Sequence, residues 1–473
     1  MDKSFLWFLV PTLLQTILGV SVMVPITTYY LDPADLGIVA ILTTCAMPVM
    51  PLSSVGDGWV LSTHWHQATL SGRRELLFNL VAANIVLKLA WIAVFWMAAP
   101  VVLPELLREY RPEYQFYFGF ALLGLLAGTL WPTVSSLMVI ERAPVSHAMN
   151  ESLQWLTAAF TTVVGLSIMK LGVLAVFLSP VAGGIVSTVH GLWYLAPKLS
   201  VQPSSRWLRE IARSGMPAIP FGLTDVIANS VDRVVIQRWL DLSALGIYAH
   251  SQSYRGMFIT VTKAYSRTMT PTFLELFAPG ATRSHGRIDE TVSLWYFSVT
   301  AGGILITLFA PELIHLLTHG KFDQAATLVP LWFLLVFAHS MGIPFTQYLL
   351  TARQSFLMSR SSILVSLASM FLVAAATRQF GVIGATAAAV FGVFALHATR
   401  ALLARRLGCR YHIEPGVFWG VAVVMALYLV TRWIELPLAA KVVLGAAVIA
   451  VGAARLMRRV SVRDLLTALA PTK

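Results

Sequence analysis

The sequence predicts an all-α integral membrane protein of about 14 transmembrane helices, with two parallel six-helix lobes and two further C-terminal helices. Of its 473 residues, 57% are apolar and only 12% are Asp, Glu, Lys or Arg. A soluble domain carries about 25% charged residues. Apolar runs of the length that crosses a bilayer, about 20 residues, recur along nearly the whole chain. No large soluble domain fits between them.

The apolar runs and the turns between them predict the individual spans. These cover approximately residues 5–29, 34–61, 76–103, 115–140, 150–171, 173–196, 211–238, 242–275, 289–317, 327–350, 356–377, 380–404, 416–434 and 437–455. An even number of spans places both termini on one side. The connectors on that side carry twenty Lys and Arg residues, against eight on the other side. The positive-inside rule therefore predicts cytoplasmic termini. The net charge of +12 then reflects topology rather than nucleic acid binding.

An internal repeat accounts for the two lobes. Residues 30–42 and 239–251 agree at six of thirteen positions, including Leu36-Gly37-Ile38 and Leu245-Gly246-Ile247. The offset of 209 residues spans six helices plus a linker, so the two copies share one orientation in the membrane. Two bundles related in this way are common among transporters.

Domain boundaries follow from the repeat and from one polar stretch. We expect an N-lobe over 1–196, a cytoplasmic linker over 197–210, a C-lobe over 211–407, and a C-terminal segment over 408–473 with two spans and a basic tail. Near the end of the linker, Arg206, Arg209 and Arg213 alternate with apolar residues. This pattern suits either a helix in the membrane interface or a solvated connector.

Span seven carries the first set of intramembrane charges. Asp225 and Asp232 lie on one face of the helix, with Arg233 beside them. Either Arg233 pairs with one of these carboxylates and holds spans seven and eight together, or the three side chains line a transport cavity. Charged side chains in a membrane are costly and usually face a cavity or a partner.

Span eight carries Arg255, Lys263 and Arg267 on one side of a helix. Arg255 and Lys263 lie well inside the span, too deep for their side chains to reach water easily. The residues favour a cationic, water-filled cavity for an anionic substrate, because arginine offers phosphate oxygens a planar fork and lysine a compact charge. A diphosphate head group would suit such a site.

Two charged residues of the first copy complete the candidate site. Lys88 lies in the middle of span three and either lines the cavity or bonds to neighbouring helices. Asp57, flanked by Gly56 and Gly58, either titrates as a proton-coupling site or pairs with a cavity cation. No catalytic residues and no metal site are predicted, because the two histidine pairs lack a third ligand and no nucleotide-binding loop is present.

The start of the second copy resembles a known family. The run Asn229-Ser-Val-Asp232-Arg233 through Leu245-Gly246-Ile247-Tyr248 is similar to the Asp-Arg…Leu-Gly-x-Tyr stretch of polysaccharide transporters, the Wzx-type oligosaccharide flippases. These belong to the multidrug/oligosaccharidyl-lipid/polysaccharide (MOP) exporter superfamily. The resemblance implies two lobes around a central cavity in a bacterial inner membrane. It also implies flipping of undecaprenyl-diphosphate-linked oligosaccharide, such as an O-antigen or exopolysaccharide repeat unit, toward the periplasm.

The resemblance carries further expectations. It implies no bound cofactor, coupling to a proton or sodium gradient, and partners that include the lipid-linked glycan, membrane lipids, a glycan polymerase and a chain-length regulator. The two extra spans resemble the fourteen-span members, including lipid II flippases. A cation-coupled multidrug exporter of the same superfamily is the second alternative, although deep cations outnumber deep carboxylates here. A membrane glycan polymerase or ligase fits less well, because every predicted outer loop is short.

Overall fold

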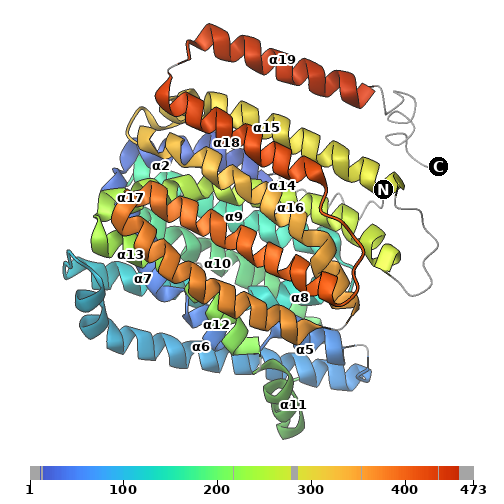
Figure 1. The fold of residues 1–473 in the computed structure, drawn as a ribbon. Helices are drawn as coiled ribbons and strands as arrows, with labels where there is room; N and C mark the ends of the chain where they lie inside the picture. Colours follow the sequence, from blue (N-terminus) through green and yellow to red (C-terminus); the bar gives the residue numbers. More distant parts are fainter. Residues whose placement is uncertain are drawn as a thin grey trace. The chain divides into compact units, whose positions relative to one another are not determined.

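The computed structural model describes residues 11, 14–65, 67–216, 218–228, 230–277, 286–352, 354–434 and 436–457 (Figure 1). These residues form helices joined by turns, without a strand. Eight helical segments in this part of the chain are long and apolar enough to cross a membrane. The predicted all-α membrane fold is confirmed.

The helices follow the predicted spans in order. The first copy of the repeat contains η1 (Gly19–Met23), α2 (Val24–Tyr30), α3 (Pro33–Ala46), α4 (Val49–Ser53), α5 (Asp57–His64), α6 (Leu70–Leu106), α7 (Glu113–Ala127), α8 (Trp131–Ile140), α9 (Pro144–Ser167) and α10 (Val173–Leu195). The linker holds η2 (Ala196–Lys198) and α11 (Ser205–Gly215). The rest comprises α12 (Ala218–Ala228), α13 (Val231–Trp239), α14 (Leu242–Phe277), α15 (Gly286–Thr318), η3 (Asp323–Thr327), α16 (Val329–Thr351), α17 (Ser355–Arg406), α18 (Pro415–Trp433) and α19 (Leu438–Met457).

Span two, predicted as one helix over 34–61, is instead three helices, α3, α4 and α5. Pro48 lies between the first two and cannot donate the backbone hydrogen bond that a continuous helix needs. Gly56 then adopts a φ of 68° immediately before α5, a conformation that glycine tolerates best. The break over 54–56 places Asp57 in the first turn of a half-helix, where the positive end of the helix dipole favours a carboxylate.

The element boundaries repeat at the offset found in the sequence. Helix α2 ends at Tyr30 and α13 ends at Trp239, 209 residues later. Gly172 before α10 has φ 56° and ψ −134°, and its equivalent Gly381 has φ 61° and ψ −143°. Only glycine adopts this region readily. The duplication is therefore present in the backbone as well as in the sequence, as two parallel repeats require.

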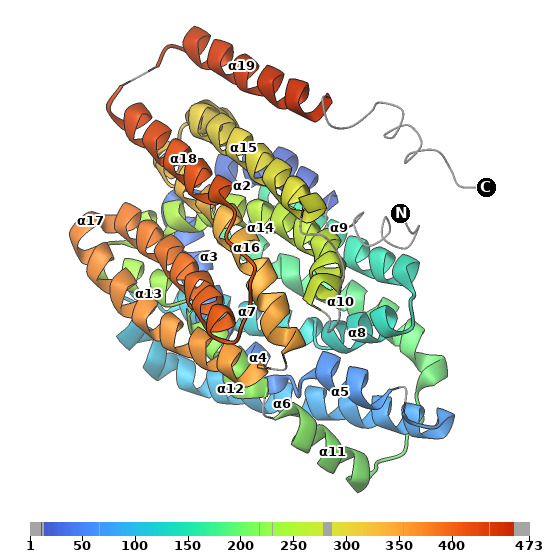
Figure 2. The same ribbon diagram turned by 45° about the vertical axis from the view of Figure 1, so that its right-hand side comes forward.

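Gly381 divides α17 into two limbs that correspond to predicted spans eleven and twelve. The limbs lie antiparallel, since Arg400 Nη2 on the second limb donates to Ser362 Oγ on the first at 3.0 Å. Figure 2 shows them side by side. A Cβ added at Gly392 would lie 2.1 Å from Ser369 Oγ, so the limbs also approach closely there. This hairpin brings residues near 360 and 400 to the same end of the bundle.

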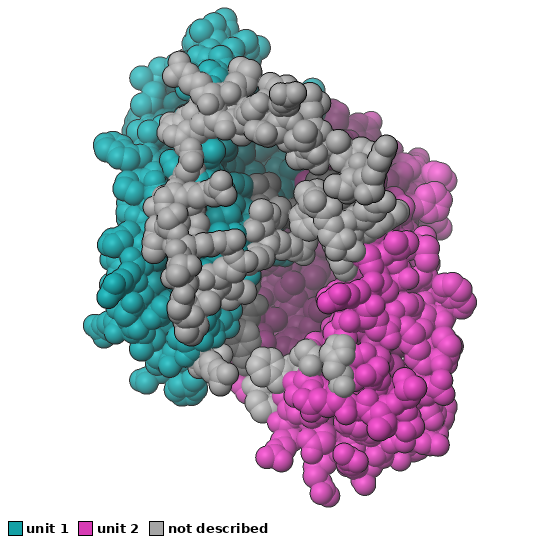
Figure 3. Space-filling view, turned by 90° about the vertical axis from the view of Figure 1, so that its right-hand side faces the viewer, with its two compact units in different colours: residues 1, 250–316, 322–473 teal, residues 2–249, 317–321 magenta. Residues whose placement is uncertain are grey.

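The chain forms two compact units, coloured separately in Figure 3. Unit 2 contains residues 2–249 and 317–321, and unit 1 contains residue 1 together with 250–316 and 322–473. In unit 1, α16 is buried along nearly its whole length. The three predicted domain boundaries, including the lobe boundary near residue 210, stay predictions.

The end of the linker lies in a helix, α11. On α11, Trp207 and Ile211 are buried and join an apolar cluster with residues of α5, α6 and α8. The side chains of Arg206, Arg209 and Arg213 are exposed. Ser204 caps the helix by accepting a hydrogen bond from the Trp207 amide. The amphipathic pattern thus packs one face of α11 on unit 2 and leaves its arginines accessible.

Candidate functional site

The charged residues of predicted span eight lie on α14 in unit 1. The guanidinium carbon of Arg255 is 5.2 Å from the centre of the Trp332 ring on α16, which is cation–π distance. Trp332 is fully buried, and its indole Nε1 donates to Ser251 Oγ of α14 at 2.9 Å. Trp332 is therefore held in place by the helix that carries Arg255. Lys263, two turns further along, has an exposed side chain.

Three further basic side chains approach from α16 and α17. His339 of α16 and His397 of α17 face each other, with 3.2 Å between Nδ1 of His339 and Nε2 of His397. Arg400, one turn beyond His397, donates to Ser362 Oγ at 3.0 Å and to Thr346 Oγ1 at 3.4 Å. Its guanidinium is thus positioned by hydroxyl groups on two other helical segments.

His339 lies within electrostatic range of three cations. The positive charges of Arg255, Arg400 and Lys263 all act on its imidazole ring. We call these four residues and His397 the cationic group of unit 1. They come from α14, α16 and the second limb of α17, so the group depends on the packing of three helical segments. The sequence predicted a cationic site on span eight. The structure adds two basic residues that were not selected from the sequence, His397 and Arg400.

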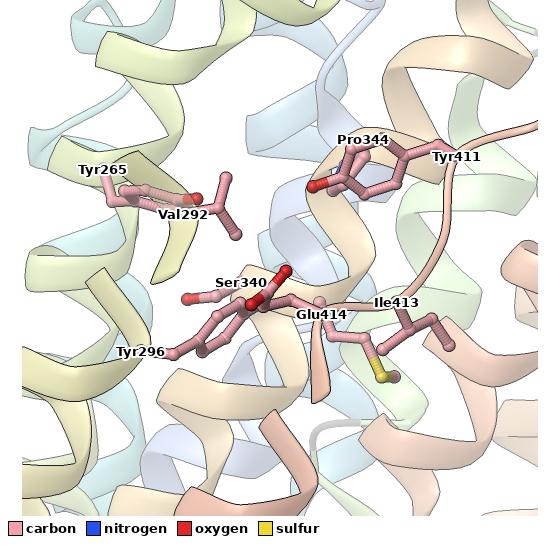
Figure 4. Close-up of a pocket in the computed structure, with 9 residues that line it drawn as sticks. Tyr265, Val292, Tyr296, Ser340, Pro344, Tyr411, Ile413 and Glu414 are labelled. Atoms are coloured by element: carbon pink, nitrogen blue, oxygen red, sulfur yellow. The ribbon is translucent and has the colours of Figure 1, made fainter. Parts of the chain in front are cut away.

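The acidic side chains described in unit 1 have partners of their own. Glu312 accepts from Lys441 Nζ at 2.6 Å. Asp323 lies 2.9 Å from His315 Nδ1. Glu414 lines a small cavity that also contains three tyrosines from α14, α15 and the 407–414 connector (Figure 4). That cavity, at about 10 Å³, has room for about one water molecule.

This arrangement can bind a polyanion. An arginine fork and neutral or protonated imidazoles donate several hydrogen bonds to phosphate oxygens, and the low dielectric of a membrane interior strengthens each one. Nearby like charges repel one another when the site is empty, and an anionic ligand relieves that repulsion. Arg267 belongs to α14 by its backbone, but its side chain lies outside the described residues, so its predicted role stays a prediction.

Asp57 is the centre of a second polar cluster, in unit 2. Its carboxylate is buried, with 4% of the residue exposed. It accepts from Thr133 Oγ1 at 2.8 Å, from Ser54 Oγ at 3.2 Å and from the amide of Asn84. The Asn84 side chain in turn accepts from the Val55 amide at 3.2 Å, in the break between α4 and α5. The interrupted span two is therefore tied to α6 and α8 through one carboxylate.

Lys88 lies one helical turn after Asn84 on α6 and is also buried, with 6% exposed. The negative charge of Asp57 acts on its ammonium group. Both roles predicted for Asp57, and the two predicted for Lys88, stay predictions. Buried opposite charges are stable only when both remain partnered, so Asp57 and Lys88 are expected to act as a unit.

Asp232 and Arg233 form contacts between helices of unit 2. Tyr248 of α14 donates its hydroxyl proton to Asp232, which is buried, and Arg233 Nη1 donates to Thr44 Oγ1 of α3 at 3.0 Å. Span seven is thus joined to spans two and eight, and the roles predicted for Asp232 and Arg233 stay predictions. Asp225 belongs to α12 by its backbone, and its side chain lies outside the described residues.

Comparison with known proteins identifies the family. A family model described as "Polysaccharide biosynthesis protein" matches residues 29–327, which is more than half of the chain. The chain belongs to this family of polysaccharide biosynthesis proteins. The matched range includes the repeated motif, the Asp57 cluster and α14. No curated protein sequence matches the chain.

Solved structures establish the fold. The inward closed conformation of the lipid II flippase MurJ has a TM-score of 0.69 and 11% identity, covering 96% of this chain and 99% of that one. An inward-facing multidrug resistance MATE family transporter of the MOP superfamily has a TM-score of 0.62 and 14% identity, covering 90% and 99%. A mutant form of the Vibrio cholerae MATE transporter VcmN has a TM-score of 0.53 and 12% identity, covering 86% of this chain and 95% of that one. The family model therefore confirms a polysaccharide family, and these structures share the fold that the sequence predicts.

Proposed function

We propose that the protein is a flippase that moves undecaprenyl-diphosphate-linked oligosaccharide from the cytoplasmic to the periplasmic leaflet by alternating access. Membership in the polysaccharide biosynthesis family and the transporter fold support the general class. The observation that carries the substrate class is the cationic group of unit 1, in which the charges of Arg255, Lys263 and Arg400 act on one imidazole. A diphosphate is the polyanion that links a glycan to its lipid carrier.

The cationic group suits a transported diphosphate better than a permanent ligand. Lys263 is exposed, and Arg255 and Arg400 are only half-buried, so an incoming head group can reach them. Arginine forks and a flexible lysine bind the phosphates through several charge-assisted hydrogen bonds, each of which breaks separately when the head group leaves. The glycan itself need not be recognised closely, because the charge is common to all lipid-diphosphate carriers.

A flipping assay tests the proposal. Purified protein in vesicles containing labelled undecaprenyl-diphosphate oligosaccharide should expose the glycan to a membrane-impermeant glycosidase on the far side. We expect Arg255→Ala or Lys263→Ala to abolish flipping while the protein stays folded. The matched control is Arg378→Ala, an exposed arginine near the turn of the α17 hairpin. Folded wild-type protein that moves no glycan lipid, or variants that match the wild type, would contradict the proposal.

Two other substrates belong in the same assay. Lipid II is the alternative suggested by the likeness to MurJ, and it carries the same diphosphate, so faster movement of lipid II would reassign the glycan but keep the cationic group. A cationic drug is the alternative suggested by the MATE structures. The buried carboxylate of unit 2 does not favour it, because the positive Lys88 acts on Asp57 from within the same cluster. The cationic group likewise repels a cation.

Energy coupling forms part of the proposal. We infer that a proton or sodium gradient acts at Asp57, the buried carboxylate that ties the interrupted span two to α6 and α8. Imposing a pH gradient or a sodium gradient across the vesicles should change the flipping rate in wild-type protein. The rate of Asp57→Asn should respond to neither gradient. A full gradient response in this variant would exclude Asp57 as the coupling site.

The orientation of the protein and its partners are proposals as well. We place both termini in the cytoplasm of a bacterial inner membrane, with a glycan polymerase and a chain-length regulator as partners that use the flipped product. Exposed α11 should then face the cytoplasm. A cysteine introduced as Arg206→Cys should react with an impermeant maleimide in inverted membranes only. Glu109→Cys, in the connector between α6 and α7, should react only in intact spheroplasts.

A further inference from the structure

Unit 2 contains an apolar cavity that the transport site does not use. Its volume is about 390 Å³, within the range of small-molecule sites. Its walls are formed by residues of α3, α6, α7, α12 and α13 and by Pro48, in the turn before α4. The lining is apolar apart from Thr44, Cys45 and Ser230. Water is not expected to fill this cavity stably, because it would find few hydrogen-bond partners there.

The cavity reaches the surface of unit 2. Its lining residues Val94, Val102 and Ile227 are 46%, 43% and 39% exposed. Ala99 and Phe118, by contrast, are each 2% exposed and form its inner wall. Helix α6 is long and apolar enough to cross a membrane, and in a bilayer its exposed side would face hydrocarbon. An opening of this kind admits a hydrocarbon chain sideways from the membrane.

One side of the cavity carries a cation. Thr44 lines the cavity and accepts the hydrogen bond from Arg233 Nη1 at 3.0 Å. Arg233 follows closely after the lining residues Ser230 and Val231 on the same chain segment. An apolar cavity with a guanidinium beside its polar wall has the two chemical features of an amphiphile site. Arginine is well suited to the phosphate of a lipid head group.

We propose that this cavity binds one acyl chain of an anionic glycerophospholipid whose phosphate lies at Arg233. At about 390 Å³, the cavity lies near the lower end of the range of small-molecule sites, roughly 300–1,000 Å³. That capacity suits most of an acyl chain and is small for the much longer undecaprenyl chain. The site is distinct from the cationic group, since its lining residues belong to unit 2.

The bound lipid would have a structural consequence. The cavity wall includes α3 of the first copy together with α12 and α13 of the second, so a chain inside it contacts helices of both repeats. Filling the space restores dispersion contacts that the lining atoms otherwise lack. Lipid occupancy should therefore stabilise the folded protein through ordinary linkage.

Photocrosslinking of purified protein tests the proposal. The probe is phosphatidylglycerol with a diazirine in its acyl chain, added to delipidated protein in detergent, with crosslinked peptides identified by mass spectrometry. Crosslinks should concentrate on the α6 and α13 residues that line the cavity. Ala98→Trp fills the cavity and should reduce this capture at least fivefold. Ala93→Trp places the same side chain on an exposed position of α6 outside the cavity and should leave capture unchanged.

The head-group contact is tested separately. Arg233→Gln should reduce capture of photoactive phosphatidylglycerol more than capture of a diacylglycerol with the same chain. Competition with undecaprenyl phosphate identifies the occupant: stronger competition than by unlabelled phosphatidylglycerol would overturn the assignment to a glycerophospholipid. Even crosslinking over the whole surface, or equal capture by the Ala98→Trp and Ala93→Trp variants, would overturn the cavity site.

The crosslinking result can be separated from effects of the variants on folding and on transport. Size-exclusion profiles check both tryptophan variants, and Val102→Trp at the cavity mouth replaces Ala98→Trp if the latter does not fold. The crosslinking uses no glycan lipid and no gradient. The crosslinking therefore tests the lipid site independently of the proposed flippase activity.

Discussion

Gly37 and Gly246, which are equivalent positions of the two repeats, lie against each other where α3 meets α14. A Cβ added at Gly246 would lie 3.0 Å from the Gly37 nitrogen and 1.7 Å from the Pro33 carbonyl oxygen. A Cβ at Gly37 would lie 2.0 Å from the carbonyl oxygen of Leu242, the repeat equivalent of Pro33. The contact is therefore symmetric: each glycine meets the first residue of the other copy's helix. Both belong to the Leu-Gly-Ile motif that revealed the repeat.

Substituting either glycine should destabilise the protein. Gly37→Ala or Gly246→Ala forces the two backbones apart, which costs about 1–3 kcal/mol in a packed core. The midpoint of thermal unfolding in detergent should fall for both variants. Gly256→Ala on the same helix α14 is the control, because a Cβ there meets nothing within 4 Å. It should be neutral or slightly stabilising, since alanine has the higher helix propensity. Equal effects at 246 and 256 would contradict the close crossing.

Asp57 and Lys88 should be energetically coupled. Asp57→Asn removes the negative charge that acts on the buried Lys88, so the variant should unfold at a lower denaturant concentration than the wild type. Adding Lys88→Met should restore at least half of the lost stability. Chemical unfolding of the single and double variants measures the coupling. Thr133→Val, which removes one hydrogen bond to Asp57, is a milder comparison at about 1 kcal/mol. Strict additivity of the two single effects would show that the residues do not act as a unit.

Arg400 should contribute to diphosphate binding although it lies near the end of span twelve. Its hydrogen bonds to Ser362 and Thr346 orient a charge that acts on His339. Arg400→Gln should weaken binding of farnesyl diphosphate, a soluble carrier analogue, by about 10- to 100-fold, because hydrogen bonds to charged groups contribute about 1.5–3 kcal/mol. Titration calorimetry on purified protein measures this. Arg378→Gln, at an exposed position of the same hairpin, should bind normally, and an equal loss in both variants would point to a nonspecific charge effect.

Cys409 should react slowly with alkylating reagents, in a pH-dependent way. It lies in the connector between α17 and α18, where burial raises the pKa of its thiol despite the opposing hydrogen bond from Tyr411 and the charge of Arg405. Only the thiolate reacts, so its alkylation rate should still be rising at a pH where an ordinary thiol, with a pKa of about 8.5, has levelled off. Iodoacetamide labelling of a Cys45→Ser chain measures the rate.

A neighbouring position provides the reference thiol. A chain with Cys45→Ser, Cys409→Ser and Arg410→Cys places the thiol at an exposed position one residue away. Its rate should level off at the lower pH. Identical pH profiles for the two chains would show that burial does not control the reactivity of Cys409.

Much of the fold follows from local sequence. The apolar runs, the 209-residue repeat and the span order could be read directly, because each helix in a membrane satisfies its own backbone hydrogen bonds. The breaks in spans two, four and seven were missed. Span two contains Pro48 and Gly56, but proline is common in membrane helices and does not by itself predict a break. The interruption persists because Asn84 and Thr133, from other helices, satisfy the groups around it.

The candidate site divides in the same way. Helical spacing was enough to place Arg255 and Lys263 on α14 and to predict an anionic cargo for them. It could not select His397 and Arg400, whose role arises when the α17 hairpin reverses at Gly381 and packs against α16. In the sequence, Arg400 is simply an arginine close to the end of a span, and nothing nearby relates it to residue 339. Thr133 similarly becomes an Asp57 ligand only through helix packing.

By itself, the sequence determined the membrane class, the duplication and the charge that distinguishes the second copy. Periodicity and composition are properties of single chain segments, so they can be recognised from the sequence without a tertiary structure. The tertiary structure alone decided which charges meet, which glycines touch and where an apolar cavity remains. These depend on contacts between residues far apart in the chain, such as Gly37 with Gly246, and such contacts follow from close packing of whole helices rather than from any local pattern.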